Sequence, residues 1–364
     1  MLTTKAAVVE APGAPFTVSE VTLDDPRPGE VLVRITAAGL CHTDLGVQAG
    51  GIPFKLPGIL GHEGAGVVEQ VGPGVTKVAP GDKVLLSFTS CGSCAACRGG
   101  HPAYCDTWLF RNLISGSRDD GTATVHRDGA AIGGHFFGQS SFAAHALADE
   151  RSVVKVSADA DLSVLAPLGC GVQTGFGAVW NVLRPGAGDT LAVFGAGAVG
   201  LSAVMAAHLL PLSAVVAIDL VPERLEMARE LGATHTVNAK TEDVTAALAE
   251  IGGIDHAVET TANPGVLRTA VDTLGIRGTC AVVGAPPGGT EVSLDVQGLL
   301  VGKRVVGVTL GDGEPETLLP LLVKLQAEGR LPLEKLIRHY SLDELNAAAE
   351  DMHHGRTIKP VVRF

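Results

Sequence analysis

Residues 191–201 read Leu191-Ala192-Val193-Phe194-Gly195-Ala196-Gly197-Ala198-Val199-Gly200-Leu201. The first four are apolar, as in a strand buried inside a parallel sheet. Glycines follow at 195, 197 and 200, in the spacing G-x-G-x-x-G, and an apolar stretch with helical periodicity comes next. The first glycine permits the turn, the second lets another group approach the backbone, and the third lets the helix pack against the strand. These residues predict the strand, turn and helix that open a βαβ unit.

The same alternation of strands and helices continues as far as residue 308. Apolar runs typical of strands lie at 191–194, 215–218, 256–259, 281–284 and 304–308, with a weaker one at 235–237. Helical periods lie between them, at 198–209, 222–231, 244–251 and 264–274. Six strands separated by helices predict a doubly wound parallel sheet, the Rossmann fold.

The rest of the chain has a different pattern. Before residue 150, short β-like runs such as 31–35 and 83–86 alternate with glycine and proline turns, and the segment after 308 is of mixed character. A length of 364 residues exceeds what one hydrophobic core holds and predicts two domains. We therefore expect the α/β class, with a mainly β domain and a Rossmann domain at 172–308.

The turn after residue 194 also predicts a cofactor. A helix N-terminus offers N–H groups and a favourable dipole to the pyrophosphate of a dinucleotide. Asp219 stands nineteen residues after Gly200, at the end of the next strand. A carboxylate there accepts hydrogen bonds from ribose hydroxyls and repels a 2′-phosphate, which favours NAD over NADP. The alternatives are a turn without ligand and Asp219 as the start of the turn into Pro222. Arg224 suits the ribose and a solvated helix surface equally well.

Charge and apolar pattern restrict the partners and the location. The 27 Lys and Arg against 39 Asp and Glu give a net charge of −12, which argues against nucleic acid and anionic membranes. Residues 1–8 lack the basic and apolar segments of a signal peptide, so a cytoplasmic location is expected. The apolar stretch at 191–220 contains three glycines and Pro211, which favours the buried βαβ unit over a membrane span.

Four of the seven cysteines lie within fifteen residues, at Cys91, Cys94, Cys97 and Cys105. In a reducing compartment, such a cluster favours metal binding over disulfides. Four thiolates at this spacing, in a segment rich in turns, can close a tetrahedron around zinc. An iron–sulfur cluster is the alternative. The lobe at about 91–105 is therefore predicted as a structural zinc site.

A second group of metal-binding residue types is dispersed along the chain. It consists of Cys41, the pair His62 and Glu63, and Cys170. Taken singly, each fits an ordinary packed cysteine, core histidine or turn carboxylate. Their occurrence beside a Rossmann unit favours one shared site.

Together these features resemble the zinc-dependent alcohol dehydrogenases of the medium-chain dehydrogenase/reductase superfamily, over nearly the whole length. The resemblance rests on Gly-His-Glu-Gly-Ala-Gly at 61–66, the four-cysteine lobe, Cys170, the glycine-rich turn, Val-Val-Gly-Ala-Pro-Pro at 282–287 and Gly-Arg-Thr-Ile-Lys-Pro at 355–360. Phe-Phe-Gly-Gln-Ser-Ser-Phe at 136–142 and Gly-Cys-Gly-Val-Gln-Thr-Gly at 169–175 are most similar to the aryl-alcohol (benzyl alcohol) dehydrogenases. The resemblance implies a GroES-like catalytic domain at 1–171 and 309–364.

The resemblance also implies roles at the dispersed group. A catalytic zinc would have three protein ligands, Cys41, His62 and Cys170, and one position open for the substrate oxygen. Thr43 would take the alcohol proton, Asp44 would hold the second nitrogen of His62, and Glu63 would lie behind the metal. Helix capping is the alternative role for Thr43 and Asp44.

Contacts with NAD are implied at further positions. The resemblance places His42 and Lys359 at the phosphates, Thr174 and Val199 near the nicotinamide, and backbone groups of Val283 and Ala285 at the carboxamide. Each of these residues also fits an ordinary position on the surface or in the packed interior. Many family members carry a histidine five residues after the first ligand cysteine, where this chain has Gly46, so the usual route of proton release is in doubt.

The implied activity is reversible, NAD-linked oxidation of a primary alcohol, aromatic or allylic, to the aldehyde. We expect two Zn²⁺ per chain and a homodimer or homotetramer. A thiol-dependent formaldehyde dehydrogenase and a broad-specificity aliphatic alcohol dehydrogenase are the alternatives, although the segment after Cys105 offers an anionic thiol adduct only Arg111. The intact ligand set opposes a zinc-free quinone reductase, and the charge opposes a zinc-ribbon nucleic-acid binder.

Overall fold

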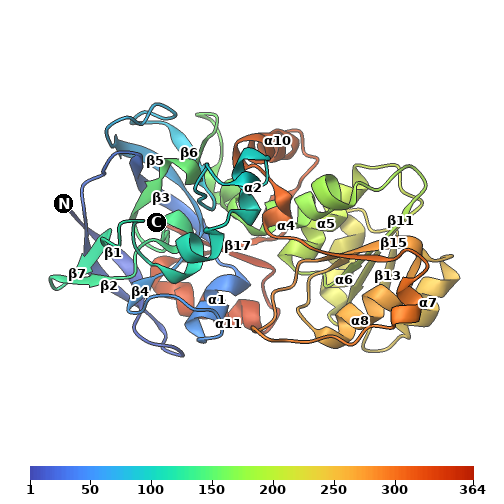
Figure 1. The fold of residues 1–364 in the computed structure, drawn as a ribbon. Coiled ribbons are helices and arrows are strands. Elements are labelled where there is room, and N and C mark those ends of the chain that lie inside the picture. The colour runs from blue at the N-terminus through green and yellow to red at the C-terminus, as the bar shows by residue number, and fades with distance from the viewer. The chain divides into compact units, whose positions relative to one another are not determined.

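The computed structural model describes residues 1–364 and consists of two units (Figure 1). Met1–Cys170 and Glu314–Phe364 form the β-rich unit, and Gly171–Gly313 forms the Rossmann unit. The second boundary lies after Gly313 and not after residue 308, because the turn at Leu310–Asp312 is bonded to the Rossmann unit. There, Asn181 Nδ2 donates to Gly311 O at 2.9 Å.

The Rossmann unit is built on one parallel sheet with the strand order β13-β12-β11-β14-β15-β16. The strands are β11 (Thr190–Phe194), β12 (Ala214–Asp219), β13 (His235–Asn238), β14 (Ile254–Glu259), β15 (Leu274–Val282) and β16 (Arg304–Gly307). From β11 the chain runs outward to β13 and then returns to fill the other side, so the order reverses beside β11. This confirms the predicted doubly wound sheet of six strands.

Helices accompany the strands of this sheet. They are α4 (Gly171–Gly177), α5 (Ala198–His208), α6 (Pro222–Glu230), α7 (Val244–Glu250), α8 (Pro264–Asp272) and α9 (Val296–Leu299). Helices α7 and α8 share a core with Phe194 and Val216 of the sheet. Helix α5 is buried along most of its length because its many alanines let it approach neighbouring elements closely. Prolines start α6 and α8, where no intrahelical N–H bond is lost.

The largest differences from the predicted boundaries are at β15, which begins at Leu274 and not at residue 281. Helix α8 ends at Asp272 and not at residue 274, because Leu274 already belongs to β15. Strand β15 ends at Val282, before residue 284, because the Gly284 N–H turns to bond Glu259 O at 3.0 Å.

The β-rich unit contains two sheets, with the orders β4-β1-β2-β7-β8 and β10-β6-β5-β3-β18-β17, and β9 pairs with β3. The strands of the first are β1 (Leu2–Val9), β2 (Phe16–Leu23), β4 (Gly58–Ile59), β7 (Val125–Arg127) and β8 (Ala130–Ile132). Those of the second are β3 (Glu30–Gly39), β5 (Glu63–Val71), β6 (Lys83–Leu86), β9 (His145–Asp149), β10 (Val153–Lys155), β17 (Ile337–Ser341) and β18 (Lys359–Arg363). The helices are α1 (His42–Gln48), α2 (Ala95–Arg98), α3 (Leu162–Leu165), α10 (Pro315–Ala327) and α11 (Leu345–His353).

Three strands of the larger sheet converge at one place. Gly39, the last residue of β3, pairs with Glu63 at the start of β5 and with Val361 of β18. Figure 1 accordingly shows the C-terminal end of the chain beside β3. Segments from near residues 40, 63 and 360 therefore lie side by side, and this junction carries the candidate site.

No single helix is long and apolar enough to cross a membrane. One pair of helical segments, 162–169 and 171–183, has the length and apolar composition of a span only when both are counted together, and the pair is bent at the break between them.

Candidate active site

Four side chains with metal-binding atoms meet in the β-rich unit. Cys41 is the N-cap of α1, His62 precedes β5, Glu63 begins β5, and Cys170 follows the turn Ala166–Gly169. One ligand atom from each lies within 4.8 Å of the others. The structure thus brings together the residues of the dispersed group.

Asp44 connects the two ends of this cluster. Its Oδ1 accepts hydrogen bonds from His62 Nδ1 at 3.1 Å and from the Gly61 N–H at 2.9 Å, while Oδ2 accepts from the Cys41 N–H at 3.0 Å. The carboxylate is fully buried and also completes a capping box at the start of α1. Capping and orientation of His62, which the sequence left as alternatives, are therefore performed by the same side chain.

The buried sulfurs and the imidazole are polarised by one another. A hydrogen bond with the Cys170 thiol is the largest cause that holds the pKa of Cys41 well below its usual value, and the same bond raises the pKa of Cys170. Burial lowers the pKa of His62, but Asp44 and Cys41 outweigh it and raise this pKa to about 10. The cluster therefore concentrates negative charge on sulfur, as a cation site requires.

The donor set fits zinc. His62 Nε2 is fully buried and has no hydrogen-bond partner, because Asp44 occupies only the other ring nitrogen. Two sulfurs and one such nitrogen are the ligands that a catalytic zinc takes in alcohol dehydrogenases, and a carboxylate on the second ring nitrogen is the usual support.

Lys359 lies behind this cluster, in contact with Glu63. Its Nζ donates to both carboxylate oxygens of Glu63, at 3.0 and 2.9 Å, and to Leu40 O at 3.0 Å. Burial lowers the pKa of Lys359, but the charge of Glu63 outweighs it and raises this pKa above its usual value, so the lysine is charged. Burial raises the pKa of Glu63 to about 7, against the opposing charge of Lys359. All three N–H groups are thereby used. The phosphate contact expected of Lys359 would need one of these bonds to be replaced.

An aromatic wall surrounds His62, and the sequence analysis did not identify it as part of the site. Phe137 stacks on the imidazole with ring centroids 4.4 Å apart, and Phe136 meets it edge-on at 5.3 Å. Trp108 packs against Phe137, and Phe54 against Phe136. The only sequence signal for this wall is the pair of adjacent phenylalanines at 136–137, within the segment that resembles the aryl-alcohol dehydrogenases.

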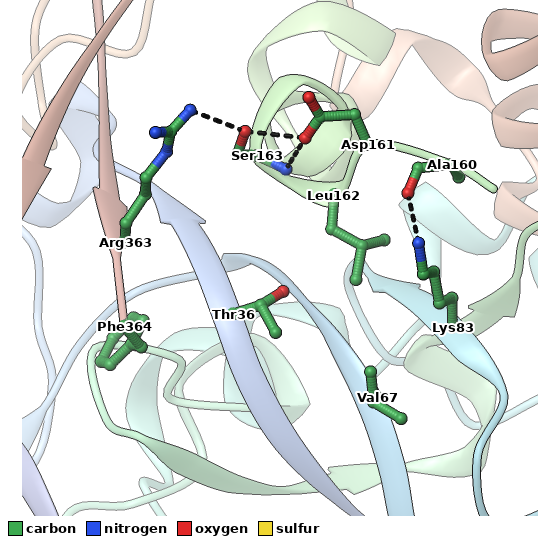
Figure 2. A pocket seen from close by; sticks show the side chains of 9 residues that line it. All are labelled: Thr36, Val67, Lys83, Ala160, Asp161, Leu162, Ser163, Arg363 and Phe364. Atoms are coloured by element: carbon green, nitrogen blue, oxygen red, sulfur yellow. Dashed lines mark hydrogen bonds between the residues drawn. The ribbon is translucent and has the colours of Figure 1, made fainter. Parts of the chain in front are cut away.

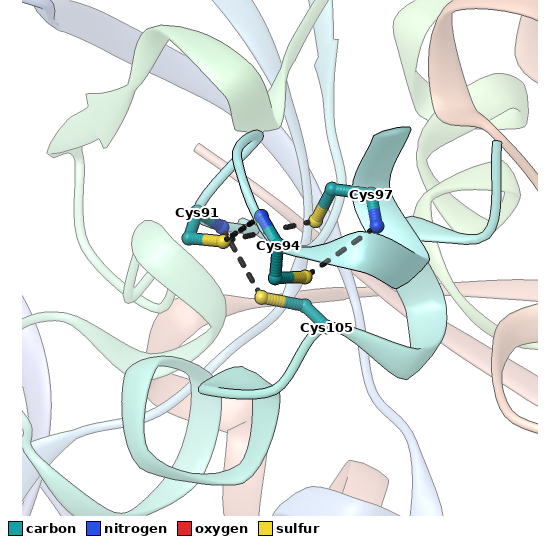
Figure 3. Close-up of side chains that lie close together, drawn as sticks. All are labelled: Cys91, Cys94, Cys97 and Cys105. Carbon is teal, nitrogen blue, oxygen red and sulfur yellow. Dashed lines mark hydrogen bonds between the residues drawn. The ribbon is translucent and has the colours of Figure 1, made fainter. Parts of the chain in front are cut away.

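The second candidate metal site is the lobe at 91–105. Figure 3 shows the four cysteine side chains pointing toward one another, and one sulfur from each lies within 4.8 Å of the others. Backbone N–H groups of Ser93 and Cys94 donate to Cys91 Sγ, at 3.4 and 3.2 Å, and lower the pKa of Cys91 to about 5. Burial is the main cause that raises the pKa of Cys97 to about 12. Four sulfurs without an open position fit structural zinc.

The glycine-rich turn of the Rossmann unit has the shape that a dinucleotide needs. Gly195 has φ +94°, and a Cβ on Gly200 would lie 1.8 Å from Gly195 O. A Cβ on Gly197, the N-cap of α5, would meet nothing within 4 Å. The first and third glycines are therefore required by the turn, whereas the second leaves space for an anion at the helix N-terminus.

Asp219 is tied to this turn. Its Oδ2 accepts from the Ala196 N–H at 2.6 Å, and its Oδ1 accepts from the N–H groups of Leu220 and Val221, at 2.7 and 2.9 Å. The carboxylate therefore performs the turn role that the sequence offered as an alternative. The same bonds hold it in one orientation beside the glycines, which is compatible with binding a ribose.

The other residues predicted to bind the cofactor lie in both units. Thr174 lies in α4, Val199 in the first turn of α5, Arg224 in α6, and Val283 and Ala285 follow β15. Arg224 Nε is buried without a hydrogen-bond partner. His42 is the exposed first residue of α1 in the β-rich unit.

Gly46, where a relay histidine was expected, lies inside α1. A Cβ there would meet Ile52 Cδ1 at 2.8 Å. The space beside this position is therefore filled by Ile52, and the histidine that many family members carry three positions after the residue equivalent to Thr43 is missing from α1.

A cavity of about 450 Å³ lies elsewhere in the β-rich unit. Figure 2 shows Lys83 bonded to Ala160 O and Arg363 bonded to Ser163 Oγ across it. It contains none of the predicted site residues, and its two cations are already bonded to protein groups. It is therefore not the candidate active site.

The comparisons with known proteins agree with this geometry. Residues 27–158 match the family model of the alcohol dehydrogenase GroES-like domain, and residues 198–324 match that of the zinc-binding dehydrogenases. Geraniol dehydrogenase of Castellaniella defragrans is 41% identical, with 100% of this chain and 98% of the relative covered. An S-(hydroxymethyl)glutathione dehydrogenase of Escherichia coli is 37% identical, with 99% of each chain covered. The crystal structure of benzyl alcohol dehydrogenase from Acinetobacter calcoaceticus superimposes with a TM-score of 0.96, at 44% identity and with 100% of each chain covered.

Fold and donor clusters thus define a zinc-binding dehydrogenase with a GroES-like and a Rossmann domain. The chain belongs to the zinc-dependent alcohol dehydrogenases of the medium-chain dehydrogenase/reductase superfamily.

Proposed function

We propose that this chain oxidises a primary aromatic or allylic alcohol to its aldehyde, reversibly, with NAD as the hydride acceptor. The observation that carries the proposal is the aromatic wall at His62, where Phe137 and Phe136 lie within 5.3 Å of the imidazole, centroid to centroid. Aromatic faces beside the reacting position favour planar, unsaturated substrates. The relatives named for benzyl alcohol and geraniol support this class, because both alcohols are unsaturated next to the carbinol carbon.

Zinc held by Cys41, His62 and Cys170 would act as a Lewis acid on the substrate oxygen, and NAD would accept the hydride. The surrounding residues position these groups. Asp44 keeps the proton of His62 on Nδ1 and so leaves Nε2 for the metal. Thr43 Oγ1 lies 3.7 Å from Cys41 Sγ, where we place the acceptor of the alcohol proton.

The cofactor preference is proposed to depend on the charge of Asp219. Asp219→Asn removes the charge that repels a 2′-phosphate. Its single oxygen can keep the bonds from the Leu220 and Val221 N–H groups, while the bond from the Ala196 N–H is lost. We expect the ratio of the Kd for NADP to the Kd for NAD to fall about tenfold or more, measured by titration of cofactor fluorescence. An unchanged ratio would show that Asp219 does not determine the preference for NAD over NADP.

The substrate class is tested by steady-state kinetics on a panel of benzyl alcohol, geraniol and ethanol. Wild-type protein should prefer the two unsaturated alcohols, and Phe137→Leu should lower kcat/KM for benzyl alcohol by about tenfold with little change for ethanol, because an aromatic contact is lost. Phe16→Leu removes the same ring at a position packed on Phe142 and serves as the matched control. Equal losses on all three alcohols would contradict the proposal.

A thiol-dependent formaldehyde dehydrogenase is the second candidate, because an S-(hydroxymethyl)glutathione dehydrogenase is 37% identical to this chain. The carboxylates of such an adduct need cationic partners. Arg111, the cation expected near the site, is paired with Asp119. Rates with formaldehyde in the presence and absence of glutathione separate the candidates, and strong dependence on the thiol would favour the second.

We also propose that two copies assemble through the edge strand β16. Several apolar side chains around this edge are exposed, among them Ile276 at 78%, Leu300 at 80% and Val305 at 42%. An unpaired strand edge beside an apolar patch suits pairing with the same edge of a second copy about a twofold axis. Sedimentation should show a dimer or tetramer, and Val305→Asp should shift the mass toward the monomer; an unaffected mass would place the contact elsewhere.

A further inference from the structure

Gln139 lies immediately after the turn Phe136–Gly138 and is fully buried. Its Nε2 donates to His62 O at 3.0 Å and to Ser87 O at 2.8 Å. Its Oε1 accepts from the Gly64 N–H at 3.0 Å. One amide therefore binds the backbone on both sides of Glu63 and connects it to the end of β6.

The hydrogen bonds of Gln139 continue through Ser87 to the segment that carries Cys170. Ser87, which accepts the second bond from Gln139, donates its own hydroxyl to Gly169 O at 2.8 Å. Gly169 directly precedes Cys170. The segments that carry His62 and Cys170 are thus linked through Gln139 and Ser87, with no metal ion in the path.

The backbone around Gln139 has a strained conformation. Phe137 and Ser140 have φ of 52° and 56°, a region that costs a residue with a side chain about 1–3 kcal/mol. Ser140 is held there by its hydroxyl, which donates to Ile59 O at 2.7 Å and accepts from the Phe136 N–H at 2.9 Å. Such strain persists where the surrounding bonds enforce it. Here the turn places the Phe137 ring against the His62 imidazole and the Gln139 amide against the His62 carbonyl.

We propose that Gln139 is a positioning residue that fixes the spacing between His62 and Cys170 and thereby slows the loss of metal from this site. The proposal rests on the zinc site of the proposed function. Without the amide, His62 O, Ser87 O and the Gly64 N–H would each lose a buried hydrogen bond, so the backbone under both ligands would shift to restore these bonds. The ligands themselves would be unchanged, but their separation would no longer be fixed before the metal binds.

The test is zinc release to a chromophoric chelator from Gln139→Met, which keeps the volume of the side chain and removes its three bonds. We expect one of the two zinc ions to leave about 10–100 times faster than in the wild type, and the zinc of the four-cysteine lobe to leave at an unchanged rate. Cobalt substitution should show altered visible bands for the same site only. Ser141→Ala is the matched control, because the Ser141 hydroxyl is buried on the same segment without a hydrogen-bond partner.

Release at the wild-type rate from a folded Gln139→Met would overturn the proposal. If that variant does not fold, Ser87→Ala decides: it removes the hydroxyl that bonds Gly169 O and so breaks the link to Cys170. Faster release then supports the proposal, and unchanged release overturns it. If the wild type holds two zinc ions and the variants release zinc at the same rate, only the role of Gln139 is refuted, and the catalytic zinc site stands. A wild-type chain with one zinc would refute the catalytic zinc of the proposed function.

Discussion

The two candidate metal sites of the β-rich unit are built in opposite ways. The lobe at 91–105 takes four sulfurs from one short segment, and three of its cysteines are partly exposed. The site at Cys41 takes its donors from three distant segments, is largely buried, and depends on Asp44, Lys359 and the backbone around β5. The four-cysteine lobe is complete within one short segment, whereas the site at Cys41 forms only when distant segments come together in the fold.

This difference explains their different chemistry. Four thiolates on a short loop complete the coordination of zinc by themselves and leave no position for substrate. The site at Cys41 combines two sulfurs, an imidazole and a carboxylate from separate segments, and Phe137 and Phe136 pack against its imidazole. The fold, and not the local sequence, therefore determines which groups surround the donors at Cys41.

The largest expected effect is a loss of activity when a ligand of the site at Cys41 is replaced. Cys170→Ser removes one thiolate ligand with almost no change in volume. We expect kcat/KM for benzyl alcohol to fall by about 10³-fold or more, because a Lewis acid contributes several kcal/mol to the barrier. Zinc analysis should show one ion per chain, and Tm should change little. A variant that keeps both zinc ions and full activity would exclude Cys170 as a ligand.

Stability should respond at the other site. Cys97→Ala opens the four-cysteine lobe, and because metal binding there is coupled to folding of the loop, we expect Tm to fall by about 5 °C or more. Calorimetry and limited proteolysis within residues 91–105 would measure this. Equal losses of Tm in Cys97→Ala and Cys170→Ser would erase the distinction between the sites.

An intermediate effect is expected from Asp44→Asn, which removes the charge behind His62 and keeps the size of the side chain. Replacement of such a partner costs about 10–100-fold in metal affinity or activity. Competition with a chelator and steady-state kinetics should both report it. The four-cysteine lobe should retain its zinc, which provides an internal control in the same protein.

Gly46→His should have the smallest effect. A side chain at this helix position gains about 1 kcal/mol of helix propensity but must displace Ile52, and overpacking costs about 1–3 kcal/mol. We therefore expect a net loss of stability of about 0–2 kcal/mol and a shift in the pH dependence of alcohol oxidation. Superimposable pH profiles would mean that the proton leaves by a route that does not pass residue 46.

The same contrast decides what could be predicted from the sequence. The four-cysteine lobe and the six alternating strands of the Rossmann unit follow from patterns within short segments, and both were predicted from residues alone. The Cys41 site was recognised through resemblance, because its members lie far apart and each has an ordinary explanation. The stacking of Phe137 on His62, the pair of Lys359 with Glu63 and the bonds of Gln139 were missed, since they depend on which strands become neighbours.

The pair of Lys359 and Glu63 also has a consequence for biosynthesis. The two residues are 296 positions apart, whereas Cys91 and Cys105 are only 14 apart. A chain emerging from the ribosome can complete the four-cysteine lobe, and fill it with zinc, while most of its residues are still unmade. Glu63 has no cation to accompany it into the interior until β18 has been synthesised and has joined β3, and a buried carboxylate alone is costly. The site at Cys41 is thus the last part of the β-rich unit that can be completed, and a chain interrupted before β18 could hold the four-cysteine lobe without it.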